Sequence, residues 1–205
     1  MRDFDYQQAY VLEDDAVRLS PLQATHIEAL RTVADDPRVW TYFLEHGCGE
    51  PHLTRYVRAA IAQREAGHAY PFAVHDQASG RIAGLTHLYE LNPSLGTLKL
   101  GHTWLGTDFH GTGLNTHAKA LLFAFAFDTL GAARIGFGVH GDNARSLRAL
   151  DKVGVQREGV LRSYLPRPDG SRADLVLLSL LRGEWETDVR RTLHRRLTSR
   201  DTLAA

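Results

Sequence analysis

The segment HGTGLN, at positions 110–115, carries the clearest chemical signal in the sequence. A predicted strand ends at Leu105 and a predicted helix begins near Leu114, so this segment is the loop that joins them. Gly111 and Gly113 allow the backbone to adopt positive φ and to come close to a ligand. The first amides of the helix have no partner within the helix, and its dipole places partial positive charge there. The pattern favours a seat for a pyrophosphate, and its alternative is a plain glycine-rich connection.

Two well-known phosphate loops do not fit this segment. It lacks the GK[ST] ending of a P-loop. It also lacks GxGxxG followed, at the distance found in dinucleotide-binding units, by an acidic residue for the ribose. The loop therefore belongs to neither class.

The elements that must position this loop follow from hydrophobic spacing and turn residues. The predicted strands are 17–22, 70–75, 81–91, 97–105, 134–139, 155–161 and 173–181. The predicted helices start near 25 and 37, run from 53 to 67, and cover 114–130, 143–153 and about 183–198, the last being amphipathic. This order predicts an α+β fold around one mixed sheet, in a single domain over 1–205.

Composition limits the function classes. Hydrophobic residues make up 43% of the 205 residues and charged residues 23%, as in ordinary globular proteins. Lys+Arg and Asp+Glu number 24 each, so no net charge draws the chain to nucleic acid or to a membrane surface. A single cysteine, Cys48, excludes an internal disulfide and a thiolate-rich metal site. Without a signal-peptide pattern or a spanning apolar run, we expect a cytoplasmic monomer or homodimer that holds no metal.

Further segments, in order, extend the signal of the loop over most of the chain. They are VRLSPL (17–22), DPRVWTYF (36–43), LGHTWL (100–105), NTHAKALL (115–122), DNARSLRAL (142–150), KVGVQREGVLR (152–162), PDG (168–170) and SLLRGEW (179–185). With HGTGLN, they resemble the GNAT N-acetyltransferase superfamily, in the branch that includes the ribosomal-protein N-terminal (alanine/serine) acetyltransferases. HGTGLN stands where that family carries its Q/R-x-x-G-x-G/A loop.

The resemblance implies a GNAT-like fold, with a mixed, mostly antiparallel sheet of about seven strands flanked by helices. Its fourth and fifth strands, 97–105 and 134–139, would be parallel and splayed apart. The pantetheine arm of coenzyme A would enter the gap like a missing strand. Its amides can pair with strand N–H and C=O groups that would otherwise have no partner.

The resemblance also implies acetyl-CoA as cosubstrate and an amine as acceptor. Main-chain amides from His110 to Asn115 would hold the pyrophosphate, although these two residues replace the family's usual Gln or Arg and Gly or Ala. Asn143 would contact the pantetheine arm, cap its own helix, or do both. The expected cosubstrate-binding residues are Trp104, Leu105, His110, Gly111, Thr112, Gly113, Leu114, Asn115, Thr116, Asn143 and Ser146.

Two departures from the family bear on catalysis. Leu150 stands where many members have a tyrosine acid, and Lys99 stands where related sequences have a glutamate. The departing thiolate would then be protonated by Ser146, by water, or not before release, and Ser146 is alternatively only a serine in the first turn of a helix. The candidate bases are His102, His140, Asp142 and Glu90. His102 suits best, because it ends the same strand as Lys99 and titrates near neutrality, and its alternative is a structural role.

The acceptor follows from ionisation. An α-amine has a pKa of about 7.7–8.0 and lysine one of about 10.4, so near neutral pH only the α-amine is substantially neutral. We therefore predict direct attack by a protein or peptide N-terminus, with main-chain amides near Trp104 and Leu105 polarising the thioester. The expected substrate-binding residues are Trp40, Lys99 and Tyr164. The open alternatives are a small amine acceptor (amino sugar, polyamine or amino acid), an acyl-CoA-binding module with little or no turnover, and an interaction protein that uses the basic run RRTLHRRLTSR.

Overall fold

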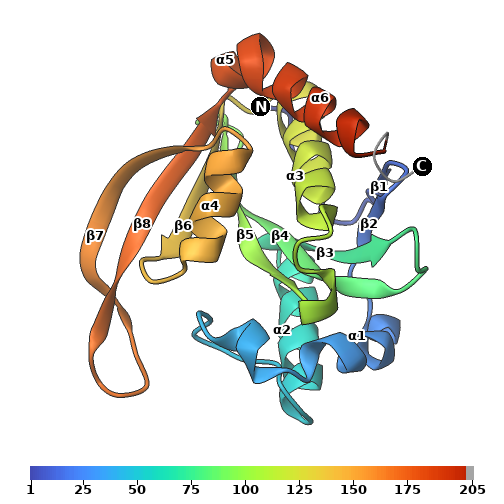
Figure 1. The fold of residues 1–205 in the computed structure, drawn as a ribbon, viewed down its shortest axis with the longest axis vertical. Coiled ribbons are helices and arrows are strands. Elements are labelled where there is room, and N and C mark those ends of the chain that lie inside the picture. The colour runs from blue at the N-terminus through green and yellow to red at the C-terminus, as the bar shows by residue number, and fades with distance from the viewer. Residues whose placement is uncertain (202–205) are drawn as a thin grey trace.

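One sheet organises the chain, of which the computed structural model describes residues 1–201, with side chains to residue 198 (Figure 1). Within those residues the strands are β1 (Leu12–Glu13), β2 (Val17–Pro21), β3 (Ala69–Asp76), β4 (Ile82–Asn92), β5 (Thr97–Leu105), β6 (Arg134–His140), β7 (Gln156–Pro166) and β8 (Arg172–Leu181). Their order across the sheet is β1-β2-β3-β4-β5-β6-β8-β7. Every neighbouring pair is antiparallel except β5 and β6, which are parallel.

Helices cover both faces of the central strands. The α-helices are α1 (Ile27–Ala34), α2 (His52–Glu65), α3 (Leu114–Ala124), α4 (Ala144–Lys152), α5 (Arg182–Glu184) and α6 (Arg190–Asp201). Short 3-10 turns are η1 (Ala24–His26), η2 (Pro37–Trp40) and η3 (Thr107–Phe109), and π-helical turns are η4 (Phe125–Thr129) and η5 (Trp185–Val189). α1 packs on β4, α2 on β3 and α3 on β2. Because residues 82–88 of β4 are all buried, and consecutive strand residues point to opposite faces, both faces are covered.

β5 and β6 pair over three residues only and then part. The paired positions are Thr97 with Arg134, Leu98 with Ile135 and Lys99 with Gly136. Each strand continues beyond this point, held on its other side by β4 or by β8. The predicted splay between two parallel central strands is confirmed, and Figure 1 shows β5 and β6 diverging.

A bulge lies on β5 where the strands part. Leu85 of β4 is opposite Trp104, but His87 is opposite Gly101, so β5 has one residue more than β4 over this stretch. His102 adopts a φ of 47°, a left-handed conformation that is uncommon outside glycine. The bulge redirects β5 at the mouth of the gap.

At the far side of the sheet, β7 and β8 extend as a long hairpin arm (Figure 1). Nearly every residue of β7 is exposed, including the apolar side chains of Val160, Leu161 and Tyr164. The predicted strand 155–161 was too short, because pairing with β8 continues to Pro166 opposite Arg172 and leaves residues 167–171, which include PDG, as the turn. The expected seven strands omit β1, whose two residues are too few to form a pattern.

The predicted helices are present with shifted ends. The predicted helix 114–130 is α3 followed by η4, and Gly131, at a φ of 75°, ends it as expected. The predicted C-terminal helix 183–198 runs as α5, η5 and α6. Residues 202–205 of the single predicted domain lie outside the described residues. None of the described helices combines the length and apolar character that crossing a membrane requires.

His87 makes stability depend on pH. Its side chain is buried in β4, Nδ1 has no hydrogen-bond partner, and desolvation lowers its pKa to about 3. An unfolded chain binds this proton near pH 6.5, whereas the folded chain does not, so the unfolded state binds more protons between pH 6.5 and 3. The free energy of unfolding should therefore fall with decreasing pH across this window, with a contribution from His87 of up to about 1.4 kcal/mol per pH unit.

We predict that His87→Gln flattens this fall. Urea unfolding at pH 7.5, 6.0 and 5.0 would measure the free energies for wild type and variant. His68→Gln, at an exposed position, is the matched control and should keep the wild-type slope. Equal slopes for wild type and His87→Gln would contradict the prediction.

Candidate active site

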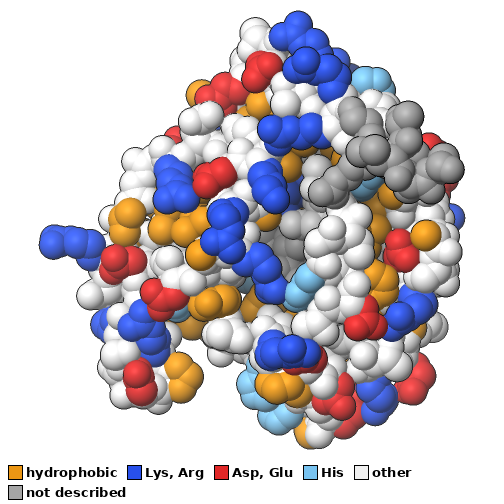
Figure 2. Space-filling model, viewed as in Figure 1, with side chains coloured by type: hydrophobic (Ala, Val, Ile, Leu, Met, Phe, Trp, Pro, Cys, Tyr) orange, Lys and Arg blue, Asp and Glu red, His pale blue; other side chains and the backbone are white. Residues whose placement is uncertain are grey.

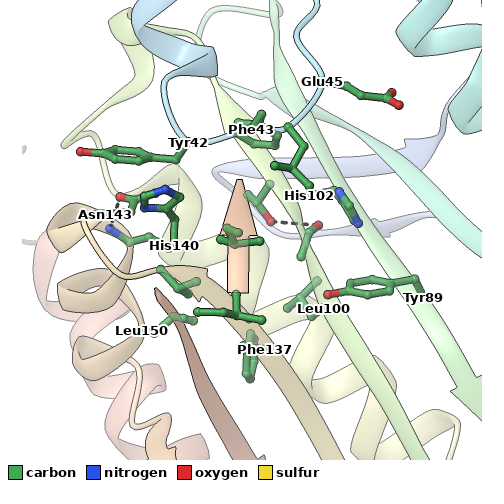
Figure 3. A pocket seen from close by; sticks show the side chains of 18 of the residues that line it. Tyr42, Phe43, Glu45, Tyr89, Leu100, His102, Phe137, His140, Asn143 and Leu150 are labelled. Atoms are coloured by element: carbon green, nitrogen blue, oxygen red, sulfur yellow. Dashed lines mark hydrogen bonds between the residues drawn. The ribbon is translucent and has the colours of Figure 1, made fainter. Parts of the chain in front are cut away.

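Where β5 and β6 part, the molecule is hollowed into two adjoining cavities. The groove, of about 1190 Å³, runs between the end of β5, the 106–113 loop, the start of α3, α4 and α6. The inner pocket, of about 490 Å³, lies between the parted strands and behind residues 42–45. Figure 3 shows the inner pocket from close by. The residues that line both cavities, which we call the junction, are Tyr42, Phe43, Thr103, Lys119, Asn143 and Ser146.

The glycine loop, beside the groove, carries main-chain amides that have no acceptor among the described residues. Gly111 and Gly113 have φ values of 80° and 98°, and Gly113 is the N-cap of α3. Among the described residues, the N–H groups of 111, 112 and 113 have no acceptor. The amide of His110 donates to Thr107 O at 3.1 Å, so it is engaged within the turn. Three adjacent amides at a helix start form an anion site.

Two of the neighbouring amides, those of Leu114 and Thr116, hold the loop instead. Leu114 N donates to Thr112 Oγ1 at 3.3 Å, and Thr112 Oγ1 donates to Phe109 O at 3.0 Å. Thr116 N donates to Gly113 O at 2.7 Å. Leu114 is buried, and neither it nor Thr112 lines a cavity. Of the expected cosubstrate-binding residues, these two therefore shape the loop, while the other nine line the groove.

His110 orients an arginine rather than facing solvent. Its Nε2 lies 3.0 Å from Leu105 O, an arrangement that needs a proton on Nε2. Nδ1 is then an acceptor, and Arg145 Nη1 lies 2.8 Å from it. Desolvation and the nearby charge of Arg145 lower the pKa of His110. A neutral His110 thus aims the Arg145 guanidinium along the groove.

α4 and α6 make the groove cationic. Arg145, Arg148 and Lys152 recur at helical spacing, so one face of α4 points into the groove. α6 contributes Arg195 and Arg196, and Arg196 donates to the carbonyl of Lys152. Figure 2 shows Lys and Arg side chains gathered along one side of the central hollow. The spacing of the cationic residues in RSLRALDK could have predicted this face from the sequence.

The inner pocket combines aromatic rings with two imidazoles and one carboxylate. His102 lies against Tyr89 and His87, with ring centroids 5.0 and 5.4 Å away. Although His102 is an exposed residue, desolvation by the surrounding side chains lowers its pKa, and the Glu45 carboxylate raises it to a smaller degree. In Figure 3 Glu45 and His102 lie on the same side of the pocket. On the other side the rings of Tyr42 and His140 lie 5.2 Å apart.

Asn143 and Ser146 meet at the junction. Asn143 Oδ1 accepts from Ser146 N at 3.0 Å, so Asn143 is the N-cap of α4. That bond uses only the carbonyl oxygen of its side chain, and the amide hydrogens remain for a ligand. Leu150, in the slot of the family's tyrosine, is buried and lines the inner pocket.

The three expected substrate-binding residues line neither cavity. Trp40 is buried, donates from Nε1 to Ala34 O at 2.8 Å, and packs on Trp104 behind the cavity wall. Lys99 pairs with Glu90 at 2.6 Å. Tyr164 is exposed on the β7–β8 arm.

Sequence reasoning missed Lys119, which lines the inner pocket from the apolar face of α3. A single charged residue within an otherwise apolar helix face was the signal that could have identified it. Within the described residues, no three His, Cys, Asp or Glu side chains group as metal ligands would.

Comparison with known proteins identifies the family. The family described as "Acetyltransferase (GNAT) domain" matches residues 16–156 of the chain. The chain belongs to this family. The parted strands and the glycine loop of this GNAT domain both fall within the matched residues.

Individual relatives agree with this assignment. The Bacillus subtilis (strain 168) protein YoaA, named an uncharacterized N-acetyltransferase, is 36% identical over 84% of this chain and 97% of its own length. YdaF of the same organism carries the provisional name ribosomal N-acetyltransferase. It is 31% identical over 52% of this chain, and the match spans only 57% of YdaF.

Solved structures share the fold. A GCN5-related N-acetyltransferase from Brucella melitensis superposes with a TM-score of 0.84, at 26% identity over 92% of this chain and 85% of that one. Mycobacterium smegmatis RimJ, in complex with CoA-disulfide, superposes with a TM-score of 0.76 at 21% identity, covering 92% and 93% of the two chains.

We predict that Arg145→Gln weakens CoA binding by roughly 10- to 100-fold, because a hydrogen bond to a charged group contributes about 1.5–3 kcal/mol. The loss should be larger at low salt, where charge attraction is less screened. Isothermal titration calorimetry with CoA at two salt concentrations would measure it. Arg58→Gln changes an exposed α2 arginine outside both cavities and is the control. Wild-type affinity in Arg145→Gln would exclude this role.

Proposed function

We propose that the protein moves an acetyl group from acetyl-CoA to a primary amine, with a protein or peptide N-terminal α-amine as first choice of acceptor. The observation that supports this most is the end of β5–β6 pairing beyond Lys99 and Gly136, beside free amides at 111–113. A molecule with an anionic head and an extended, amide-bearing arm satisfies both sets of unpaired groups. Membership of an acetyltransferase family supports the same chemistry.

The residues present suit each part of acetyl-CoA. The pyrophosphate fits the free amides at 111–113, with the positive end of the α3 dipole behind them. Arg145, Arg148 and Lys152 supply charge-assisted donors for phosphate oxygens. The side-chain amide of Asn143, which lines the junction, would donate to the pantetheine arm.

The same geometry suits the thioester. The acetyl group would lie at the junction, between the groove that holds the cosubstrate and the inner pocket that receives the amine. Trp104 and Leu105 line the groove just beyond the bulge, where a main-chain N–H would polarise the thioester carbonyl. Holding both reactants in one site supplies much of the rate enhancement by proximity.

In the proposed reaction the neutral amine attacks the thioester carbonyl carbon. A C–N bond forms, the C–S bond breaks, and the electron pair of that bond leaves on sulfur. The proton lost by the amine passes, directly or through water, to His102, whose lowered pKa keeps it neutral and able to accept near pH 7. The Glu45 carboxylate at the pocket favours a cationic amine on approach. Ser146, which the sequence analysis predicts as a proton donor to the sulfur, lies at the junction.

Two considerations favour an α-amine acceptor. Its pKa of about 7.7–8.0 leaves it partly neutral at physiological pH without a strong base. The name of YdaF points to ribosomal N-acetylation in a relative. A small amine, or CoA binding with little turnover, are the competing functions that an acceptor screen separates.

We expect CoA release, followed with a thiol reagent, from acetyl-CoA and peptides with free N-terminal Ala or Ser. The same peptides with blocked N-termini and internal lysine should give no release. Release with only polyamines, amino sugars or amino acids would replace the peptide acceptor by a small amine. CoA binding without release from any amine would leave a binding module.

We predict that His102→Asn lowers kcat for the preferred acceptor by at least about 10-fold, since general base catalysis contributes about 10²–10⁴. Asparagine tolerates the positive φ of this position better than most residues. Below the pKa of His102, log(kcat/KM) of the wild type should fall with a slope approaching 2, because the base and the amine are both protonated. The slope of the variant should be 1.

His68→Asn is the control for this substitution and should leave the profile unchanged. Identical profiles for wild type and His102→Asn would assign His102 a structural role.

A further inference from the structure

Lys119 is a buried cation at the junction. It lies on α3 and is only 8% exposed. Of the residues that line both cavities, it alone bears a charged side chain; the others are Tyr42, Phe43, Thr103, Asn143 and Ser146. Burying an ammonium group costs several kcal/mol unless an anion or several hydrogen bonds compensate it.

The described part of the chain compensates Lys119 only in part. Its Nζ donates to Asn115 Oδ1 at 2.6 Å, one turn earlier on α3. No carboxylate of the described residues lies within salt-bridge distance of Nζ. One neutral acceptor leaves most of the ammonium's hydrogen-bonding capacity unused. A buried cation arranged in this way is suited to an anion that arrives with the ligand.

Resting on the proposed function, we propose that Lys119, and not Ser146, is the catalytic acid for the leaving group: its ammonium faces the sulfur of CoA, stabilises the departing thiolate and protonates it. When the C–S bond breaks, its electron pair stays on sulfur and one Nζ proton moves to that sulfur. This gives free CoA thiol and a neutral amine on Lys119. The lysine regains a proton from water once the products leave, so atoms and charges balance over the cycle.

The position of Lys119 indicates that it faces the sulfur of the ligand and not its pyrophosphate. Lys119 lies six residues beyond Gly113, the N-cap of α3, which corresponds to about 9 Å along a helix. It lines the inner pocket together with Leu100 and Phe137 of the parted strands, whereas Gly111 and Gly113 line only the groove. A pyrophosphate held by the loop amides stays at the groove, so the group that comes into reach of both cavities is the thioester end.

Two side chains that depart from the family pattern are consistent with this role. Asn115, in place of Gly or Ala, is the residue that holds the ammonium. Leu150, in place of a tyrosine acid, contributes an apolar wall and no proton. Burial also lowers the pKa of Lys119 to about 8, below the value of about 8.5 for a cysteine thiol, so transfer of a proton from its ammonium to a thiolate is favourable.

The test compares CoA with desulfo-CoA, which carries hydrogen in place of the thiol, at pH 8.0 in the 205-residue chain. We expect wild type to bind CoA about 10-fold more tightly than desulfo-CoA, because about half of Lys119 is then cationic and its ammonium stabilises the thiolate form of CoA. Lys119→Met should abolish this preference while it retains the affinity for desulfo-CoA. Its kcat with acetyl-CoA and the preferred amine should fall about 10- to 100-fold, with little change in KM for acetyl-CoA.

Three further variants complete the design. Lys119→Arg keeps a charge but does not release a proton, so it should retain the preference for CoA and lose kcat. Asn115→Ala should show a smaller form of both Lys119→Met effects. Arg58→Met, outside both cavities, is the control, and circular dichroism checks that each variant folds.

Each other result overturns the proposal. Equal loss of CoA and desulfo-CoA affinity in Lys119→Met would place the ammonium on the pyrophosphate. An unchanged preference and an unchanged kcat would make Lys119 structural. The binding comparison needs no acceptor, so it decides the thiolate contact even if no amine is acetylated, which would defeat only the proposed function. Absence of any CoA binding by wild type would defeat both.

Discussion

The structure depends on one missing set of hydrogen bonds, those between β5 and β6 beyond Lys99 and Gly136. Main-chain N–H and C=O groups are costly to leave without partners, so a strand is kept apart from its neighbour only if other contacts hold it there. β4 and β8 provide those contacts along the outer sides of the two strands. The bulge at His102 redirects β5 at the same point. The gap is therefore built into the sheet before any ligand is present.

Around this gap, cationic and polar groups are concentrated at the groove and become fewer toward the inner pocket. The free amides at 111–113 and the cationic face of α4 lie at the groove, where polar groups meet solvent. Deeper in, Lys119 is the charged group at the junction, and the inner pocket is lined largely by aromatic and aliphatic side chains with Glu45 at one side. A ligand that is strongly anionic at one end and weakly polar at the other matches this gradient. Electrostatic attraction at the groove then orients the molecule before its reactive end reaches the strands.

Much of this arrangement was predictable from sequence, and the exceptions have physical reasons. The glycine loop and the Asn143 cap depend on local signals, namely glycine at positive φ and an N-cap residue. The splayed strands were expected from the resemblance to the GNAT superfamily and not from a local pattern. Trp40 is not a cavity residue, because it packs against Trp104 in the core. These two residues are far apart in the sequence, so no local pattern predicts their contact. Lys119 lies within an apolar helix face, and hydrophobic periodicity predicts the helix there without assigning a role to a single lysine. The neutral state of His110 depends on Leu105 and Arg145 together, which no local pattern brings into contact.

The last helix has a dual position in the fold. α6 packs on α3, and its residues Thr192, Arg195, Arg196 and Leu197 form one side of the groove. Any molecule that contacts this side binds the docked helix and not the detached one, so occupancy and docking reinforce each other by mass action. α6 is thus a wall of the groove rather than an appendage. Shortening the chain into α6 removes that wall.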